Sequence, residues 1–373
     1  MSAGQPDQLG ALRAAQAACR LLSGDLIVQS RTSGNWLRLT GTLREIWEAL
    51  EHPIELDRLV MNFASRYRGA PGVVEGGLLE GLDLLEQHGL LAAAPTPSAE
   101  ARQRDRYLWL LKRALTNLLY PEHDLRMVFL QGKGQTLAHD DLARALRDIR
   151  IEQPEAFRAV VDGKLVGHEP KARSHTMIGL FRLTSLERCA EAVLADAVRG
   201  DFLEAGVGQG GAAIFMRALQ EAHGAGERRT WLADSFQGVP APDASDAPFG
   251  VDLSEARAPW LAFDVATVQE HFRRYDLLGP QVRFIPGWLA DTLPTAETGP
   301  LALLRIDVDL FSSTTTALDV LYDRVAPGGC VIVDDYGGLA ACRAAVDQFR
   351  ARRGVAEPLQ WADADGVFWR KPA

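Results

Sequence analysis

Cysteine and basic charge are both scarce in this sequence, and each shortage excludes a class of protein. Four of 373 residues are cysteine, and Cys19, Cys189, Cys330 and Cys342 lack the spacing of a metal site. A disulfide framework is therefore not expected, and each cysteine is predicted to be reduced and mostly buried. Acidic residues exceed basic ones to give a formal net charge of −9, so general attraction to nucleic acid or anionic membrane is not expected.

Long apolar runs are also missing. No segment approaches the length of a membrane span, and the N-terminus has no signal-peptide core, so we expect a cytoplasmic protein without a membrane partner. What is present is the composition of a globular protein, with 47% hydrophobic and 24% charged residues. The length of 373 residues predicts two domains with sizeable cores.

The clearest pattern is a strand–helix–strand unit over residues 301–336 in which both strands end in carboxylates. The first apolar run leads into Asp307 and Asp309, and the second, after a predicted turn at Pro-Gly-Gly, leads into Asp334 and Asp335. Because side chains alternate along a strand, Asp307 and Asp309 are expected to point the same way, and the valine between them into the sheet. Parallel strands place their carboxyl ends at one edge, so both acidic pairs are expected in one crevice.

Carboxylates that converge in this way repel one another unless a cation lies among them. An all-oxygen set suits Mg²⁺, Mn²⁺ or Ca²⁺. The alternative is that these aspartates only cap helices and solvate loops, which explains most single aspartates after strands. Two pairs, each directly after a buried strand, favour the metal site.

A second pattern predicts a nucleotide cofactor. The strand Asp201–Leu203 leads into a glycine-rich loop, residues 204–211, and then an apolar helix, while the next strand ends in Asp234. Glycines permit close approach of a ligand beside a helix N-terminus, and an acid at the end of the second strand commonly holds ribose hydroxyls. This signal alone also fits a dinucleotide. S-adenosylmethionine is favoured because Glu204 would repel a pyrophosphate, and because a C-terminal hairpin, residues 357–369, is typical of methyltransferase sheets.

The first quarter of the chain has the outline of a winged helix. Residues 1–24 are predicted to be an extension with a short helix before residue 20, and residues 25–91 to contain two strands and three helices. The strands are predicted at 26–28 and 36–39, and the helices at about 42–50, 56–67 and 74–88. None of the three helices has a clustered basic face, so DNA binding is not expected.

Residues 25–91 resemble the PqqD-like peptide chaperones, also called precursor-recognition elements of ribosomal peptide pathways. The resemblance rests on WLRLTGTLREIWEAL, LDRLVMNFASRY and LLEGLDLLEQHGLL. It implies that a leader peptide binds as an added strand at the sheet edge. The alternative is a generic winged-helix module used for dimerisation.

An Ala/Pro-rich linker, residues 92–100, then separates this domain from a catalytic domain over residues 101–373. Within the second domain, residues 122–170 give few structural signals. His139, His168 and His175 lack metal-ligand spacing and are predicted to be surface or loop residues.

Residues from about 105 to 370 resemble the macrocin O-methyltransferase family, which methylates sugar hydroxyls on macrolides and aminocoumarins. The matching stretches include HTMIGLFRL, EAGVGQGGAAIFMRA, ADSFQGVP, LLRIDVDLFSST and APGGCVIVDDY. The resemblance implies a Rossmann-like α/β methyltransferase sheet with a C-terminal antiparallel hairpin. It also implies that Asp307, Asp334 and Asp335 bind Mg²⁺ and that Asp309 is the general base. The implied S-adenosylmethionine site consists of Thr176, Met177, Glu204, Gly206, Gly208, Asp234 and Ser235.

The sequence departs from the family pattern on both sides of the implied site. Gly208-Gln209 stands where the family usually has Trp-Arg, and Val308 and Ser312 stand where Gly and Glu are usual. The cofactor loop is therefore expected to be smaller and the acceptor side of the pocket to differ.

Three functions follow from these patterns. The first is O-methylation of a hydroxyl or carboxylate in a leader-bearing peptide held by residues 25–91. The second is methylation of a small-molecule glycoside, with the first domain used to form a homodimer. The third is a peptide-binding adaptor with an inactive enzyme half, against which the intact acidic set argues. The fused first domain favours the peptide, because a glycoside needs no peptide-binding edge.

Overall fold

The computed structural model describes residues 98–120 and 174–372 without interruption. In the first part of the chain it describes residues 12–14, 17–22, 25–30, 36–39, 41–50, 71–88 and 90–93, and the positions 59, 63, 163 and 164 are also described. The chain divides into two units, residues 1–102 and 103–373. Each unit has a hydrophobic core of its own.

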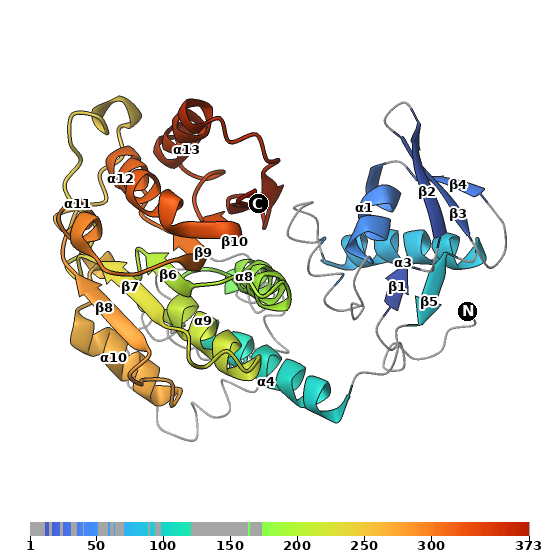
Figure 1. The fold of residues 1–373 in the computed structure, drawn as a ribbon, viewed down its shortest axis with the longest axis horizontal. Helices are drawn as coiled ribbons and strands as arrows, with labels where there is room; N and C mark the ends of the chain where they lie inside the picture. The colour runs from blue at the N-terminus through green and yellow to red at the C-terminus, as the bar shows by residue number, and fades with distance from the viewer. Residues whose placement is uncertain are drawn as a thin grey trace, which may run out of the picture. The chain divides into compact units, whose positions relative to one another are not determined.

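The described residues of the first unit form two small sheets and the two helices α1 and α3 (Figure 1). Its three-stranded antiparallel sheet has the order β2–β3–β4, formed by Ala17–Leu22, Asp25–Ser30 and Trp36–Leu39. A second antiparallel pair joins β1, Leu12–Ala14, to β5, Leu91–Ala93. The helices are α1, Gly41–Ala49, and α3, Pro71–Gln87. Their apolar faces meet in one core that includes Val28, Leu39, Ile46, Leu50, Leu78, Leu82 and Leu85.

Several expectations for this unit can be compared with the structure. The strands at 26–28 and 36–39 and the first and third helices are confirmed. The helix expected before residue 20 is wrong, because Ala17–Leu22 pairs antiparallel with β3. Bonding to an open strand edge outweighs the helix preference of its alanines. The helix expected over 56–67 lies outside the described residues except at Leu59 and Phe63, both buried.

The second unit is built on a seven-stranded sheet with the order β11–β12–β10–β9–β6–β7–β8 (Figure 1). The strands β6 to β10 are parallel to one another, and β12 runs antiparallel to β10. Their bounds are β6 Asp201–Ala205, β7 Thr230–Asp234, β8 Val282–Pro286, β9 Leu301–Ile306, β10 Val325–Val333, β11 Gln360–Trp361 and β12 Val367–Arg370. The chain leaves β6 toward β7 and returns from β8 to β9 on the other side. The switch point of this doubly wound sheet therefore lies between β6 and β9, where ligands bind.

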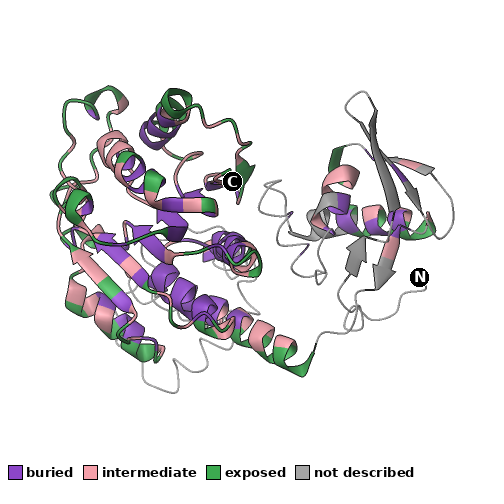
Figure 2. Cartoon of the chain, in the orientation of Figure 1, coloured by how far each residue is buried: buried purple, intermediate pink, exposed green. Residues whose placement is uncertain are grey.

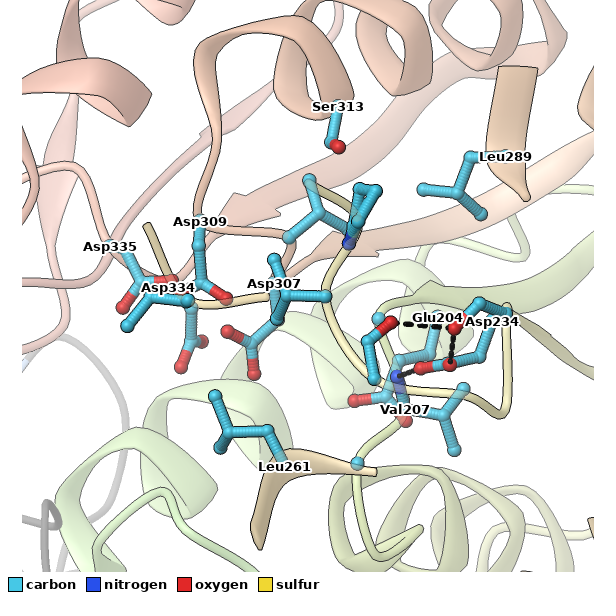
Figure 3. A pocket seen from close by; sticks show the side chains of 18 of the residues that line it. Glu204, Val207, Asp234, Leu261, Leu289, Asp307, Asp309, Ser313, Asp334 and Asp335 are labelled. Carbon is cyan, nitrogen blue, oxygen red and sulfur yellow. Dashed lines mark hydrogen bonds between the residues drawn. The ribbon is translucent and has the colours of Figure 1, made fainter. Parts of the chain in front are cut away.

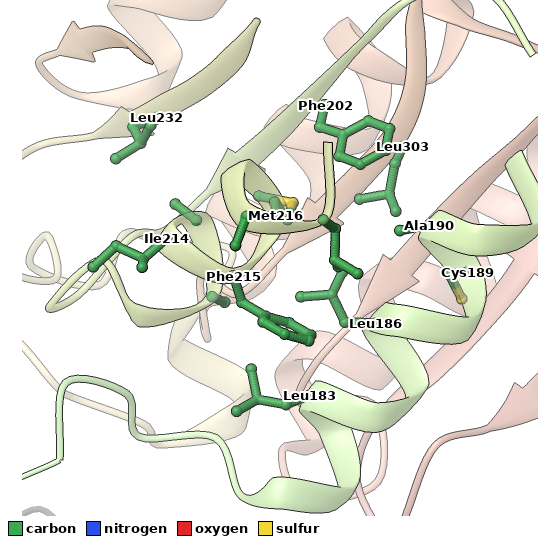
Figure 4. Close-up of a cluster of buried hydrophobic side chains, with 14 of the residues drawn as sticks. Leu183, Leu186, Cys189, Ala190, Phe202, Ile214, Phe215, Met216, Leu232 and Leu303 are labelled. Carbon is green, nitrogen blue, oxygen red and sulfur yellow. The ribbon is translucent and has the colours of Figure 1, made fainter. Parts of the chain in front are cut away.

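Helices cover one face of this sheet as a tightly packed layer. It contains α4 (Ala99–Leu115), α8 (Leu180–Ala195), α9 (Gly211–Ala222) and α10 (Val265–Arg274). Figure 4 shows Leu183 and Leu186 of α8 with Phe215 of α9 at the centre of this core, beside Phe202 and Leu303 of the strands. The first ten residues of α9 are all buried, and Figure 2 shows this helix buried on nearly every side.

The opposite face is covered by α11 (Leu289–Thr292), α12 (Phe311–Leu321) and α13 (Ala340–Arg353). The core on this side includes Leu304, Leu318 and Phe349, and it continues to Trp369 of β12. Every residue of β9 is buried, as expected for a strand covered on both faces. Short 3₁₀ helices occur at Ala247–Phe249, Pro259–Leu261, Leu293–Thr295 and Tyr322–Arg324.

The predicted methyltransferase sheet and its C-terminal hairpin are confirmed. One detail differs, because Pro327–Gly329 lies inside β10 instead of forming a turn. The register of β10 on β9 shifts between Val325 and Cys330, so these residues form an irregularity at the start of the strand. Most of residues 122–170, which gave few structural signals in the sequence, lies outside the described residues. Cys189, Cys330 and Cys342 are buried and unbridged, as predicted. In the described part of the chain, no helix is long and apolar enough to cross a membrane.

Candidate active site

A cavity of about 570 Å³ opens at the carboxyl ends of β6, β7, β9 and β10, at the switch point of the sheet. All of the site residues predicted from the sequence line it. They are Thr176, Met177, Glu204, Gly206, Gly208, Asp234, Ser235, Asp307, Asp309, Asp334 and Asp335. Figure 3 shows the four aspartates that follow β9 and β10 on one side of the cavity and Asp234 with Val207 on the other.

Glycine is required in the loop after β6 because the backbone of other segments approaches it closely. Gly206 has φ +82°, and a Cβ there would lie 1.8 Å from the carbonyl oxygen of Asp307. A Cβ on Gly211 would lie 2.3 Å from the carbonyl oxygen of His175. The loop therefore presents bare backbone at the N-terminus of α9, where polar ligand groups are favoured. Gly208 also has positive φ, +50°, but open space lies beside it.

Asp234 at the end of β7 fixes this loop. Its Oδ2 accepts a hydrogen bond from the Val207 amide at 2.6 Å, and its Oδ1 accepts one from the Phe236 amide at 2.7 Å. Burial raises the pKa of Asp234, while these backbone donors lower it. The Ser235 hydroxyl also donates to Oδ1, at 3.4 Å. A carboxylate at this edge of the cavity is an acceptor for hydroxyl groups of a ligand.

Glu204 and Arg305, both of which line the cavity, form a buried ion pair and are 1% and 2% exposed respectively. Oε1 of Glu204 accepts from the guanidinium of Arg305, whereas its Oε2 is buried without a hydrogen-bond partner. Burial raises the pKa of Glu204 to about 8, with Arg305 opposing that rise. Glu204 lines the cavity, and a buried carboxylate oxygen without a partner is suited to a cationic group nearby.

Asp334 is held by two arginines. Its Oδ2 lies 2.7 Å from Nη1 of Arg182 and 2.8 Å from Nη2 of Arg305. Burial acts to raise the pKa of Asp334, but these two charges hold it below its ordinary value. Arg182 also pairs with Asp363 at 2.7 Å, which ties α8 to the turn between β11 and β12. Asp334 is therefore ionised at neutral pH, and both of these contacts use the same oxygen.

Three other carboxylates of the cavity converge on one another. One oxygen from each of Asp307, Asp309 and Asp335 lies within 4.8 Å of the other two, an arrangement that could hold a metal ion. Burial raises the pKa of Asp309 to about 7, and the charges of Asp307 and Asp334 add to this effect. Burial and the neighbouring aspartates likewise raise the pKa of Asp335 well above its ordinary value. A divalent cation among these oxygens would offset their mutual repulsion.

The aspartates meet for a reason other than the one expected. Strand β9 ends at Ile306, so strand alternation does not extend to Asp309. Asp309 instead has φ +60°, a left-handed conformation that turns the chain into α12. Val308, expected to point into the sheet, lines the cavity while also packing on the core beneath it.

His175 lies in a loop, as expected, but its side chain is half-buried and not on the open surface. Its Nδ1 lies 2.7 Å from the hydroxyl of Tyr275, and its ring lies 4.4 Å from that of His271. His271 in turn contacts the carbonyl oxygen of Gln209 through Nδ1 at 2.8 Å. This cluster supports the glycine loop from α10 and from the segment that leads into Thr176.

Sequence reasoning did not identify Arg182 and Arg305, which line the cavity and balance its carboxylates. A signal was available for Arg305, because it is the charged residue within the apolar run 301–306. An arginine in a buried strand requires an acidic partner nearby. Arg182 offered no comparable signal, since its partners Asp334 and Asp363 are distant in sequence.

Comparison with known proteins agrees with this geometry. The family described as Macrocin-O-methyltransferase (TylF) matches residues 104–371. A tetracenomycin 4'-O-methyltransferase of Streptomyces olivaceus, named for a dimethoxy-rhamnosyl substrate, is 44% identical over 272 residues, which cover 72% of this chain and 94% of that protein. The mycinamicin III 3''-O-methyltransferase of Micromonospora griseorubida is 43% identical, covering 72% and 96%. The structure of the O-methyltransferase NovP matches with a TM-score of 0.60 and 38% identity, covering 72% of this chain and all of that one.

A parallel sheet with a reversed last strand, a glycine loop after its first strand and an acid after its second defines an S-adenosylmethionine-dependent O-methyltransferase. The chain belongs to the macrocin O-methyltransferase family. The match begins at residue 104, so residues 25–91 lie outside it. The resemblance of that segment to PqqD-like chaperones stays a prediction.

Proposed function

We propose that this protein transfers the methyl group of S-adenosylmethionine to a hydroxyl of a glycosylated small molecule. The observation that carries the proposal is that two parts of the site face each other across one cavity in a chain of this family. One is the glycine loop after β6, residues 204–211, here named the donor loop, and the other is the acidic cluster of Asp307, Asp309, Asp334 and Asp335. Two relatives, each more than 40% identical, are named for O-methylation of a tetracenomycin rhamnoside and of mycinamicin III. This favours the small-molecule alternative over the peptide as substrate.

The residues on the side of the donor loop match S-adenosylmethionine in charge and hydrogen bonding. Asp234 would accept from the ribose hydroxyls, with Ser235 beside it. The buried Oε2 of Glu204 would face the ammonium group of the methionine moiety. Thr176, Met177, Gly206 and Gly208 would enclose the remainder.

Magnesium or manganese fits the acidic half. We propose that Asp307, Asp334 and Asp335 bind the ion and that Asp309 is the general base. The oxygens that lie within 4.8 Å of one another are those of Asp307, Asp309 and Asp335, so Asp309 is the alternative ligand to Asp334. A metal ligand must be ionised, as Asp334 is held by its arginines, and its Oδ1 is not used by either of them. A base is most effective with a pKa near neutrality, as burial gives Asp309. When bound, the cation would make an acceptor hydroxyl more acidic.

The chemical step needs little else from the protein. The acceptor oxygen loses its proton to Asp309 and forms a bond to the methyl carbon as the carbon–sulfur bond breaks. The products are a methyl ether, S-adenosylhomocysteine and a proton that Asp309 releases to water. The sulfonium is already activated, so the main contribution of the cavity is to hold oxygen, carbon and sulfur in line.

A second candidate keeps the peptide as the substrate, and one observation favours it. Strand β4 pairs with β3 along one edge and, among the described residues, has no strand on its other edge. An open edge of this kind can accept an extended peptide as an added strand. In this reading residues 25–91 capture the leader of a precursor, whereas in the first reading they form a homodimer contact.

One experiment separates the two candidates. The protein is incubated with S-adenosylmethionine, Mg²⁺ and either a panel of rhamnosides carrying aromatic or macrolide aglycones or a precursor peptide encoded beside its gene. A mass increase of one methyl group on a glycoside, lost when the sugar hydroxyls are blocked, supports the proposal. Methylation of the peptide alone would overturn it.

A further inference from the structure

The segment between β7 and α10, residues 238–262, forms one wall of the cavity and carries about half of its apolar lining outside the donor loop. We name it the acceptor loop. Its lining residues include Val239, Pro240, Leu253, Trp260 and Leu261. Trp260 is 56% exposed although it lines the cavity, and Figure 3 shows the Leu261 side chain directed toward Asp307 and Asp334.

The acceptor loop is bound to the start of α12 by a buried carboxylate. Asp246 is 1% exposed, and it accepts from the amide of Ser312 at 3.0 Å and from its hydroxyl at 2.8 Å. It also accepts from the Asp243 amide at 3.0 Å within the loop. Beside this contact the rings of Phe249 and Phe311 are stacked with centroids 5.5 Å apart.

This contact replaces the usual local cap of a helix. Leu310 at the N-cap of α12 offers no side-chain hydrogen bond, so the first amides of the helix need acceptors from elsewhere. Asp246 supplies one from 66 positions away and places a negative charge at the positive end of the helix dipole. The helix begins just after Asp309, so one carboxylate joins the acceptor loop to the segment that carries the proposed base.

We propose that Asp246 is a positioning residue for acceptor binding. Through Ser312 it holds the acceptor loop across the cavity, so that Trp260 and Leu261 contact an apolar or aromatic part of the acceptor while its hydroxyl lies at Asp309. The inference rests on the proposed function, since it assigns the part of the substrate next to the reacting sugar. It names as substrates glycosides with a flat apolar aglycone, in preference to free sugars.

The test compares Asp246→Asn, Asp246→Ala and Ser312→Ala with Ser245→Ala, a control in the same loop whose hydroxyl bonds to Asp243 and not to Asp246. We expect the acceptor KM to rise about tenfold or more in Asp246→Ala and Ser312→Ala, the loss of about 1.4 kcal/mol of binding. The rise in acceptor KM should be smaller in Asp246→Asn, because the amide keeps one acceptor oxygen. The dissociation constant for S-adenosylmethionine should stay within about twofold of the parent value. A parallel loss of donor affinity would overturn the proposal.

A second measurement needs no acceptor. Arg257 in the acceptor loop has a side chain 75% exposed, so trypsin can report on the loop by cleaving after this residue. We expect faster cleavage at this bond in Asp246→Ala and Ser312→Ala than in Ser245→Ala. An unchanged rate would show that the Asp246–Ser312 contact does not hold the acceptor loop. If the contact does hold the loop but the parent methylates no glycoside, the proposed function alone is contradicted.

The apolar contact is tested with Trp260→Ala. Its KM should rise for a rhamnoside with an aromatic aglycone and stay unchanged for methyl rhamnoside, which has no apolar part to contact the indole. An equal rise for both acceptors would contradict the assigned substrate class.

Discussion

Nη2 of Arg305 in β9 lies 2.8 Å from Oδ2 of Asp334 at the end of β10. The same guanidinium pairs with Glu204 at the end of β6. The buried guanidinium of Arg305 therefore joins the donor side of the cavity to its acidic side. Without it, carboxylates from three adjacent strands would face each other in the interior.

Replacing Arg305 by methionine should destabilise the fold strongly. Removing one partner of a buried pair leaves uncompensated charge and costs about 3–5 kcal/mol. Arg305 holds the pKa of Asp334 below its ordinary value, so its contribution is complete above the unfolded pKa of 3.8 and is lost as pH falls below it. In denaturant unfolding, the free energy of unfolding of the methionine variant should be far below that of the parent at pH 7 and closer to it at pH 3. Arg305→Lys, which keeps the charge, should lose less.

The two glycines with positive φ at the start of the donor loop should respond differently to alanine. Gly208→Ala meets open space and should cost about 1–2 kcal/mol from its backbone conformation alone. Gly206→Ala adds a clash with the carbonyl of Asp307 and should cost ~3 kcal/mol or more. Equal unfolding free energies for the two variants would contradict the close approach of these two segments.

Asp234→Ala should weaken the binding of S-adenosylmethionine by about 10- to 100-fold, because hydrogen bonds to a charged acceptor are lost. Titration calorimetry measures this directly. Asp201→Ala is the matched control, since that residue bonds to Arg229 and Trp231 near the start of the strands and does not line the cavity. Binding of NAD at comparable affinity would contradict the donor assignment.

The two proposed roles of the acidic cluster can be separated by metal titration. Asp307→Asn and Asp335→Asn should raise the Mn²⁺ concentration needed for half-maximal activity. Asp309→Asn should lower kcat by about 10²- to 10⁴-fold with little change in metal affinity, as expected for a lost general base. If Asp309→Asn weakens Mn²⁺ binding as much as Asp335→Asn does, Asp309 is a ligand. Asp334→Asn tests the remaining ligand in the same assay.

His175 should make stability depend on pH. Burial, then the neighbouring His271 and Arg274, lowers its pKa from 6.5 to about 4. Between these values the unfolded chain binds a proton that the folded protein does not, so stability is complete above pH 6.5 and falls toward pH 4. The ring is partly exposed, so we expect a loss of about 1 kcal/mol over this range, reduced by solvent screening. His175→Leu should flatten the slope in denaturant unfolding, and a parallel pH profile for both proteins would contradict the assignment.

Much of this site was accessible from the sequence because its residues follow buried strands. Asp234, Asp307, Asp334 and Asp335 each come directly after an apolar run, and parallel strands bring such ends together. Glycine spacing marked the donor loop in the same way. The contacts between distant segments were not accessible, since Asp246 and Ser312 are 66 residues apart and neither lies in a motif. Arg182 reaches Asp363 over a still longer separation.

The first domain shows a different limit. Its alanine-rich start favoured a helix by local preference, yet residues 17–22 pair with β3. Whether such a segment becomes a helix or a strand depends on whether a pairing strand lies beside it in the fold, and local sequence preference does not reveal that neighbour.

The left-handed backbone of Asp309, φ +60°, sets stability against the proposed chemistry at this position. An aspartate tolerates this conformation at a cost that glycine does not bear. Asp309→Gly should therefore give a protein that melts at a higher temperature and lacks the proposed base. Selection for stability alone would favour glycine here, so the aspartate is a residue that stability does not explain.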